Sequence, residues 1–204
     1  MSGRHERGFT LLELVIALAI VGALLVIAFS GLRVGLAAWA QGSDRADAHQ
    51  HLRGIALVLE RALGTTYPYR AAPGSSPEQT LLFRGTDTRV EFVTQSSPAP
   101  FSIPIAFTAV VIGVESDEGT ALVVRQRPLP NRDPFTAATE AFRDPSVSSV
   151  KFRYMNEEGV WQDSWDAGAE NALPRAIEIT VASAWGGRSE TVGPLTVPLR
   201  VASQ

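Results

Sequence analysis

The sequence contains no cysteine in its 204 residues. Disulfide bonds, thiolate metal sites and cysteine nucleophiles are therefore excluded. Lysine is almost as scarce, since Lys151 is the only one among 18 basic residues. The formal net charge is −3 and the pI is about 5.6, whereas a nucleic-acid-binding protein usually has a basic face. The composition therefore indicates one domain of ordinary size with an appendage, and no nucleic-acid partner.

Proline is absent from the first third of the chain, because all 13 prolines lie at or beyond Pro68. Within this third, residues 9–32 are almost wholly apolar. As a helix they would be about 36 Å long, enough to cross a hydrocarbon core of about 30 Å. Arg4 and Arg7 precede them, and basic residues favour the cytoplasmic side of a membrane. The pattern predicts a single membrane span with a cytoplasmic N-terminus and a translocated head.

A cleaved secretory signal peptide also begins with basic residues before an apolar run. Its apolar region is usually about 7–15 residues long and ends at a small-residue cleavage site. The run found here is longer and contains Glu13, although a charge inside a span costs about 2.5–3.5 kcal/mol on insertion scales. We therefore expect Glu13 to have a function and a partner of opposite charge.

The helical pattern continues beyond residue 32 and becomes amphipathic. Four apolar residues at i, i+3, i+7 and i+11 form one stripe: Leu52, Ile55, Leu59 and Leu63. Gly64 is a natural stop, so we expect one helix over 9–63 whose second half, 33–63, packs on the head. Gly31 and Gly35 form a GxxxG pattern, which fits either close helix packing or a flexible exit from the membrane.

The hexapeptide from Gly8 to Glu13, GFTLLE, resembles the processing site of type IV pilin-like proteins. In that family a prepilin peptidase of the inner membrane cuts after the glycine and N-methylates the new terminal residue. The resemblance implies a leader of residues 1–8, cleavage after Gly8, and N-methylation of Phe9. It also implies that Glu13 pairs with the terminal ammonium of a neighbouring subunit. Such a pair is tolerable in an apolar bundle, where either charge alone is costly, and it fixes the axial register.

Strand-like runs follow residue 64 until the end of the chain. They cover residues 80–84, 89–94, 105–115, 121–127, 149–155, 175–184 and 195–201. Several alternate with period two, as in Val150, Phe152 and Tyr154. The segment 117–119 is typical of a hairpin turn. One long helix followed only by strands predicts an α+β, pilin-like fold, with a β-rich head over 64–204 whose antiparallel sheets pack on the second half of the helix.

Part of this head resembles a narrower group of proteins. Phe152–Tyr154, Gly159–Trp161, Trp165 and Leu173–Ile177 are similar to the C-terminal region of the pseudopilin J family (GspJ) of type II secretion. The resemblance implies a minor pseudopilin at the tip of a periplasmic filament, where pseudopilins I and K are its partners. It implies roles in filament initiation and in the secretion of folded proteins, with secreted substrates as further partners. The partner contact is expected between about Trp39 and Leu63, on the side away from the apolar stripe.

Two alternatives remain open at this point. A minor pilin of a type IV pilus or competence system has a similar length, although many such pilins carry a C-terminal disulfide that this sequence cannot form. A periplasmic enzyme or binding domain with a simple N-terminal anchor belongs to another class. Such an anchor needs neither Glu13 nor the Gly8–Phe9 junction, so these residues favour the pilin-like class.

The sequence gives little indication of catalysis, cofactor or metal binding. Beyond the leader, its histidines are His49 and His51, which point to different faces of a helix and are expected to be solvated. Two acidic groups lack EF-hand spacing and are expected to be turn residues instead of Ca²⁺ ligands: Glu115, Asp117 and Glu118, and Glu157, Glu158, Asp163 and Asp166. Trp161 and Trp165 are expected to pack beneath the loop before Pro174. We predict a non-enzymatic protein without a cofactor.

Overall fold

The computed structural model describes residues 10–72, 78–99, 105–117, 119–185 and 188–199. The chain forms two compact units, Met1–Asp47 and Ala48–Gln204. The helix α1 (Leu11–Gly64) belongs to both, since its first 37 residues, 11–47, lie in the first unit and 48–64 lie in the second. We refer to the second unit as the head.

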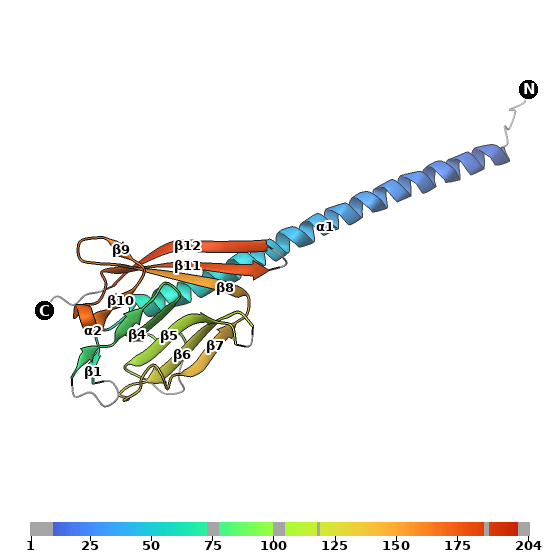
Figure 1. Ribbon diagram of the computed structural model, residues 1–204. Helices are drawn as coiled ribbons and strands as arrows, with labels where there is room; N and C mark the ends of the chain where they lie inside the picture. The colour runs from blue at the N-terminus through green and yellow to red at the C-terminus, as the bar shows by residue number, and fades with distance from the viewer. Residues whose placement is uncertain (1–9, 73–77, 100–104, 118, 186–187, 200–204) are drawn as a thin grey trace, which may run out of the picture. The chain divides into compact units, whose positions relative to one another are not determined.

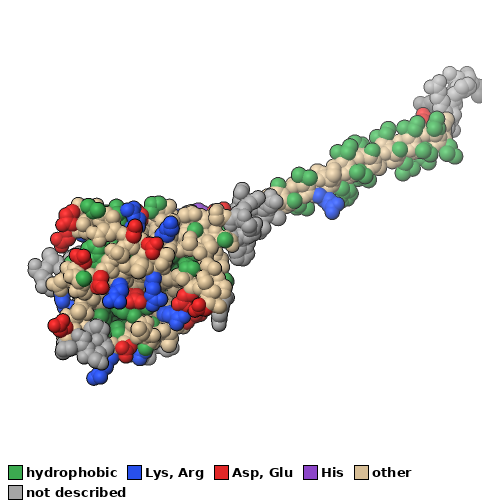
Figure 2. Space-filling model, in the orientation of Figure 1, with side chains coloured by type: hydrophobic (Ala, Val, Ile, Leu, Met, Phe, Trp, Pro, Cys, Tyr) green, Lys and Arg blue, Asp and Glu red, His purple; other side chains and the backbone are tan. Residues whose placement is uncertain are grey.

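From Leu11 to Trp39 the helix α1 is apolar on all sides. Every described side chain from 10 to 39 is exposed within the chain. An 18-residue window within the segment Leu11–Trp39 has a mean hydropathy of 2.9. Hydrophobic side chains cover it, whereas acidic and basic side chains are intermixed on the visible face of the head (Figure 2). A helix that is apolar all round buries itself in lipid or among other helices, and no such partner is supplied by its own unit.

The helix in the head has one buried face. The predicted stripe is confirmed, because all four of its residues are buried together with two alanines: Leu52, Ile55, Leu59, Leu63, Ala56 and Ala62. The helix ends at Gly64, where the hydroxyl groups of Thr65 and Thr66 donate hydrogen bonds to carbonyl groups of the last turn, with Thr66 Oγ1 2.6 Å from the oxygen of Leu63. These bonds satisfy carbonyls that have no partner within the helix.

Two antiparallel sheets build the rest of the head, and the C-terminal part of α1 lies between them (Figure 1). The first sheet has the order β10 (Trp165–Asp166), β3 (Phe83–Gly85), β4 (Arg89–Thr94), β5 (Thr108–Glu115), β6 (Ala121–Pro128), β7 (Thr139–Asp144). The second has the order β12 (Arg188–Pro198), β11 (Ala176–Trp185), β8 (Val147–Met155), β9 (Trp161–Gln162). A separate pair is formed by β1 (Arg70–Ala71) and β2 (Thr80–Leu81).

One contact between the sheets depends on a glycine. The ring of Tyr154 in β8 packs edge-on against Phe83 in β3, with 6.0 Å between ring centroids. Its hydroxyl donates to the carbonyl of Thr86 at 2.9 Å, and burial raises the pKa of this hydroxyl. A Cβ at Gly85 would collide with the Tyr154 ring, so only glycine leaves the ring its place. Both sheets and the helix thereby share one core.

The predicted α+β, pilin-like fold is confirmed, with local differences. Strand β4 has the predicted bounds, and β5 and β6 pair antiparallel across the predicted turn, of which residue 118 lies outside the described part. Strand β7 was not expected, and β12 begins at Arg188 instead of residue 195. The prediction of strands alone after α1 was wrong, because Asp166 accepts a hydrogen bond from the Gly168 amide and caps a short helix, α2 (Ala167–Glu170).

Candidate assembly and docking sites

The N-terminus of α1 is closed by Thr10 and Glu13. The amide and the hydroxyl of Thr10 both donate to Glu13 Oε2, at 3.1 and 3.0 Å, and the Glu13 amide donates back to Thr10 Oγ1 at 3.3 Å. This reciprocal arrangement is a capping box, which satisfies helix donors that lack intrahelical partners. The predicted processing residues, Gly8 and Phe9, lie outside the described residues.

The capping box gives Glu13 a second role that we did not expect. The Thr-x-x-Glu spacing was visible in the sequence and is a recognised signal for a helix start. Both of its hydrogen bonds reach Oε2, and the side chain is exposed within the chain. Glu13 therefore presents a carboxylate at the end of an apolar helix, held in place by Thr10 and accessible to a further donor.

In the described part of the chain, one helix is long and apolar enough to cross a membrane, namely the segment Leu11–Trp39 of α1. Gly31 and Gly35 lie in this segment, and a Cβ at either position would meet nothing within 4 Å. The GxxxG face is therefore open within its own unit.

The helix also has an exposed apolar ridge in the head, formed by Leu57 and Val58. These side chains are 59 % and 47 % exposed. Leu57 lies opposite the buried stripe, and Val58 lies about 100° further round the helix, at the edge of its exposed face. Beside Leu57 lies a hollow of about 530 Å³. It is lined by Leu57, Glu60, Arg61, Gly64, Val197 and Pro198, which come from α1 and β12. The ridge and the hollow together form a partly apolar surface that the described residues leave uncovered.

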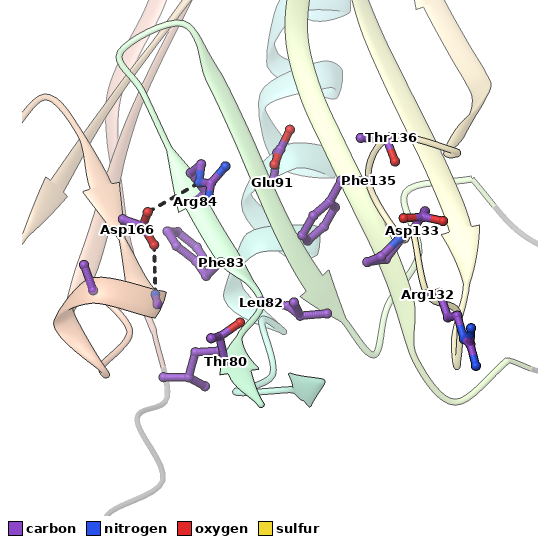
Figure 3. A pocket seen from close by; sticks show the side chains of 14 residues that line it. Thr80, Leu82, Phe83, Arg84, Glu91, Arg132, Asp133, Phe135, Thr136 and Asp166 are labelled. Carbon is purple, nitrogen blue, oxygen red and sulfur yellow. Dashed lines mark hydrogen bonds and ion pairs between the residues drawn. The ribbon is translucent and has the colours of Figure 1, made fainter. Parts of the chain in front are cut away.

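A second hollow, of about 490 Å³, lies between α2, the strands β2 and β3, and the loop after β6 (Figure 3). Leu82, Phe83 and Phe135 contribute apolar surface to it. Around them lie Arg84, Glu91, Arg132, Asp133 and Asp166. Because acidic and basic groups are mixed around this hollow, its charge selects no ligand of one sign.

The sequence led us to expect that His49 and His51 are solvated. In the structure both also contact a carboxylate. His51 Nε2 lies 2.6 Å from Asp144 Oδ2, and His49 Nδ1 lies 3.7 Å from Glu190 Oε2. Each imidazole therefore faces a carboxylate from a distant part of the sequence. Among the described residues, no cluster of three or more metal-ligating side chains occurs. That the two histidines share no metal stays a prediction.

The acidic groups are also more engaged than turn residues would be. Glu115 accepts two hydrogen bonds from Arg125, which raise the pKa of that guanidinium, and it lies 3.6 Å from Arg143. Asp163 pairs with Arg153, and Asp166 pairs with Arg84. Glu118 lies outside the described residues. The interpretation as solvated turn acids fits Asp163, which lies between β9 and β10 with its side chain 78 % exposed. It was wrong for Glu115 in β5 and Asp166 in β10, which are strand residues that pair with arginines.

The two tryptophans differ in their surroundings. Trp165 is buried, and its indole Nε1 donates to the carbonyl of Ala172 at 2.9 Å, which confirms its packing beneath the segment before Pro174. Trp161 is half-buried and lies under the guanidinium of Arg153, 5.9 Å from its ring centroid. Both tryptophans therefore have structural roles within the head.

The sequence matches two models of known protein families. The family model of type II secretion system protein J matches residues 30–193. The chain belongs to the type II secretion system protein J family. A model of the prokaryotic N-terminal methylation motif matches residues 3–29, which include Gly8, Phe9 and Glu13. A search of curated protein sequences gave no match.

Family membership decides between the alternatives that the sequence left open. The protein is a minor pseudopilin of the type II secretion system, and the type IV pilus alternative is set aside. Members of such a family act with other pseudopilins and are processed by a prepilin peptidase. The apolar N-terminal helix fits a membrane anchor in this context. The family is structural, in contrast to the alternative of an anchored periplasmic enzyme.

Proposed function

We propose that this minor pseudopilin is a structural subunit at the tip of the pseudopilus, where it joins pseudopilins I and K and helps to start filament assembly. Its activity is assembly and not catalysis, and it needs no cofactor. The observation that carries this proposal is the uncovered apolar ridge of Leu57 and Val58 on the helix of the head. An apolar ridge on a helix is the feature that a second helix needs for packing.

The proposed maturation begins with removal of residues 1–8 by the prepilin peptidase. Cleavage after Gly8 exposes Phe9, which is then N-methylated. Residues 9–32 span the inner membrane with the N-terminus in the cytoplasm, 33–63 continue the helix, and 64–204 complete the periplasmic head. The methylation motif over residues 3–29 and the apolar segment Leu11–Trp39 support this division.

Glu13 is the proposed assembly residue. After cleavage, the ammonium of Phe9 on a neighbouring subunit needs a counter-charge in apolar surroundings, because an unpaired buried charge is costly. The exposed carboxylate of Glu13 supplies one at a fixed place on the helix. Thr10 orients this carboxylate through Oε2, which supports pairing at a single axial offset between subunits.

Docking of the partners is proposed along the exposed face of α1 in the head. Arg53, Leu57, Val58 and Arg61 are all exposed on it. A specific contact buries about 800 Å² on each partner. The hollow beside β12 adds Val197 and Pro198 to the helical ridge. Partner helices that lie against this surface cover the apolar side chains of the ridge.

The test compares two valines of similar exposure in different places. Val58 is 47 % exposed on the ridge, and Val160 is 56 % exposed on the connection between β8 and β9. Val58→Asp should reduce co-purification with pseudopilins I and K at least about tenfold, since it desolvates a charge in the contact. Val160→Asp should leave it unchanged, and the thermal unfolding of both variants should match the wild type. Equal complex formation by Val58→Asp and wild type would remove this docking surface.

A further inference from the structure

His49 and His51 fasten the same turn of α1 to the outer strands of two different sheets. His51 faces Asp144 at the end of β7, which is an edge strand of the six-stranded sheet. His49 faces Glu190 in β12, which is an edge strand of the four-stranded sheet. Residues that are two positions apart on a helix are separated by about 200° around its axis, so the two imidazoles point in different directions. One helical turn is thereby held from both sides.

The pair of His51 and Asp144 is the tighter of the two. The Asp144 side chain is 7 % exposed, and its other oxygen, Oδ1, accepts from the amide and the hydroxyl of Ser146 at 2.8 and 2.6 Å. Burial opposes the ionisation of Asp144, but the hydrogen bonds from Ser146 and His51 outweigh it, so its pKa lies below the usual value. A buried carboxylate that remains charged needs such partners.

The pair of His49 and Glu190 is looser and depends more on charge. Its atoms lie 3.7 Å apart, too far for a good hydrogen bond, and both side chains are partly exposed. A neutral imidazole at this distance gains little from the carboxylate, whereas a protonated imidazole gains an ion pair. This contact therefore strengthens when His49 carries a proton.

The two pairs lie on a part of the helix that the core does not hold in place. The first buried residue of α1 is Leu52, so residues 48–51 add no fully buried side chain to the core. In the described part of the chain, the two histidine pairs are the hydrogen bonds or ion pairs that join side chains of 48–51 to the sheets. The beginning of the helix in the head is thus held by contacts that depend on protonation.

Other charged groups lie on α1 and on the strands packed against the histidines. On α1, the acidic Asp47 stands four positions before His51, and the basic Arg53 stands four positions after His49. On β7, Arg143 next to Asp144 pairs with Glu115 and Glu140. The carboxylates of Asp144 and Glu190 therefore provide the direct contacts of the two imidazoles.

We infer that His49 and His51 form a pH-dependent clasp, which holds the start of the head helix to both sheets more tightly in mildly acidic surroundings than in alkaline ones. The device goes beyond the assembly role and does not depend on it. Imidazole gains its charge between about pH 5 and pH 8. In this range the protein changes the strength with which it holds one turn of the helix through which it is proposed to meet its partners.

The direction of the effect follows from the charges. An imidazole that carries a proton and faces a carboxylate forms an ion pair, whereas a neutral imidazole offers at most a neutral hydrogen bond. When the pH falls below the range of imidazole titration, Asp144 takes up a proton. Because the pKa of Asp144 is lowered, its contribution is present above the ordinary aspartate pKa of about 3.9 and is lost as the pH falls below it. The clasp is therefore tightest in mildly acidic solution.

The absence of cysteine allows a clean test on the full chain in detergent. Leu52→Cys places a thiol at a position that is 1 % exposed and becomes reactive only when the helix start opens. Leu57→Cys places one at a position that is 59 % exposed and measures intrinsic reactivity. The ratio of their maleimide rates at each pH removes the pH dependence of the thiolate itself. If Leu52→Cys does not fold, Ala56→Cys, at a position that is also 1 % exposed, replaces it.

The expected result is that protection of the buried thiol is about threefold greater at about pH 6 than at about pH 8, as befits partly exposed ion pairs. His51→Gln and Asp144→Asn should each abolish most of this difference, and Glu190→Gln should reduce it. Asp163→Asn removes an exposed carboxylate elsewhere in the head and should leave the difference intact. Equal protection at both pH values, or an unchanged pH dependence in His51→Gln, would overturn the inference.

Discussion

The two parts of α1 belong to one continuous helix and have opposite relations to their surroundings. Between Leu11 and Trp39 its described side chains are all exposed and mostly apolar. Between 48 and 64 it buries a single stripe against two sheets and exposes its other face. The periodicity of the apolar residues accounts for the difference, because a helix that is apolar all round requires apolar surroundings on every side, whereas a striped helix requires them on one.

Folding depends on one part of the molecule, and insertion and assembly depend on the other. The head stabilises itself through a core shared by the helix and the sheets. The first part of the helix contains no such contacts and depends on lipid or on other subunits. Substitutions in the head should therefore affect folding, whereas substitutions in the first part should affect insertion and assembly.

The largest effect on folding is expected for Leu59, which is 1 % exposed in the head. Leu59→Ala should lower the free energy of unfolding of the head by about 3 kcal/mol, because it removes buried methyl groups and leaves a cavity. Leu24, which is 60 % exposed in the first unit, is the matched control. Leu24→Ala should leave head unfolding unchanged within about 0.5 kcal/mol. Denaturant titration of the full chain in detergent, followed by tryptophan fluorescence, measures both, and equal losses would contradict the division.

The next effect concerns Glu13 and separates its two roles. Gln can replace Glu in a capping box but carries no charge. If Glu13 serves assembly through its charge, Glu13→Gln should reduce secretion as strongly as Glu13→Leu, at least about tenfold, because a desolvated ion pair is lost. Both variants should still insert in the membrane. Thr10→Val removes the cap but keeps the carboxylate, and it should retain more secretion than Glu13→Gln.

Each variant is expressed at the native level in a strain of its own, and the amount of secreted protein measures the effect. Wild-type secretion by Glu13→Gln, together with a defect in Thr10→Val, would show that capping is the function of the pair.

Effects of opposite sign are expected at two glycines in different environments. Gly85→Ala should destabilise the head by about 1–3 kcal/mol, because the new methyl group collides with the ring of Tyr154. Gly54 lies on the exposed face of α1, where a Cβ meets nothing within 4 Å. Gly54→Ala should therefore stabilise the head by about 0.5–1 kcal/mol through helix propensity. Opposite signs in thermal unfolding are required, and destabilisation by both would mean that the helix face at Gly54 is occupied.

Much of the fold could be predicted because its signals are local. The apolar stripe from Leu52 to Leu63 repeats at helical spacing, and β8 alternates with period two, so both were found. Strand β7 was missed because it is an exposed edge strand with a mixed sequence, TEAFRD, and no alternation. The start of β12 was missed because the strand contains Gly193 at a positive φ of 117° next to Pro194, a pattern that resembles a turn.

The candidate sites were also predictable only where their residues are close together in the sequence. Glu13 and its Thr-x-x-Glu motif are local, although the capping role went unnoticed. The partners of the histidines were out of reach, since His51 and Asp144 are 93 positions apart in the sequence. Only the fold brings β7 and β12 to opposite sides of one helical turn. Pairings of this kind need the structure.

If the apolar part of α1 begins the mature protein as the assembly helix of a pseudopilin, the first residue of that protein is Phe9. Intact-mass analysis of protein extracted from membranes measures this. We expect a chain that begins at Phe9, carries one added methyl group and has 196 residues (204 − 8). An N-terminus that still includes residues 1–8, or a cut near Ala37 as expected of a secretory signal peptide, would contradict it.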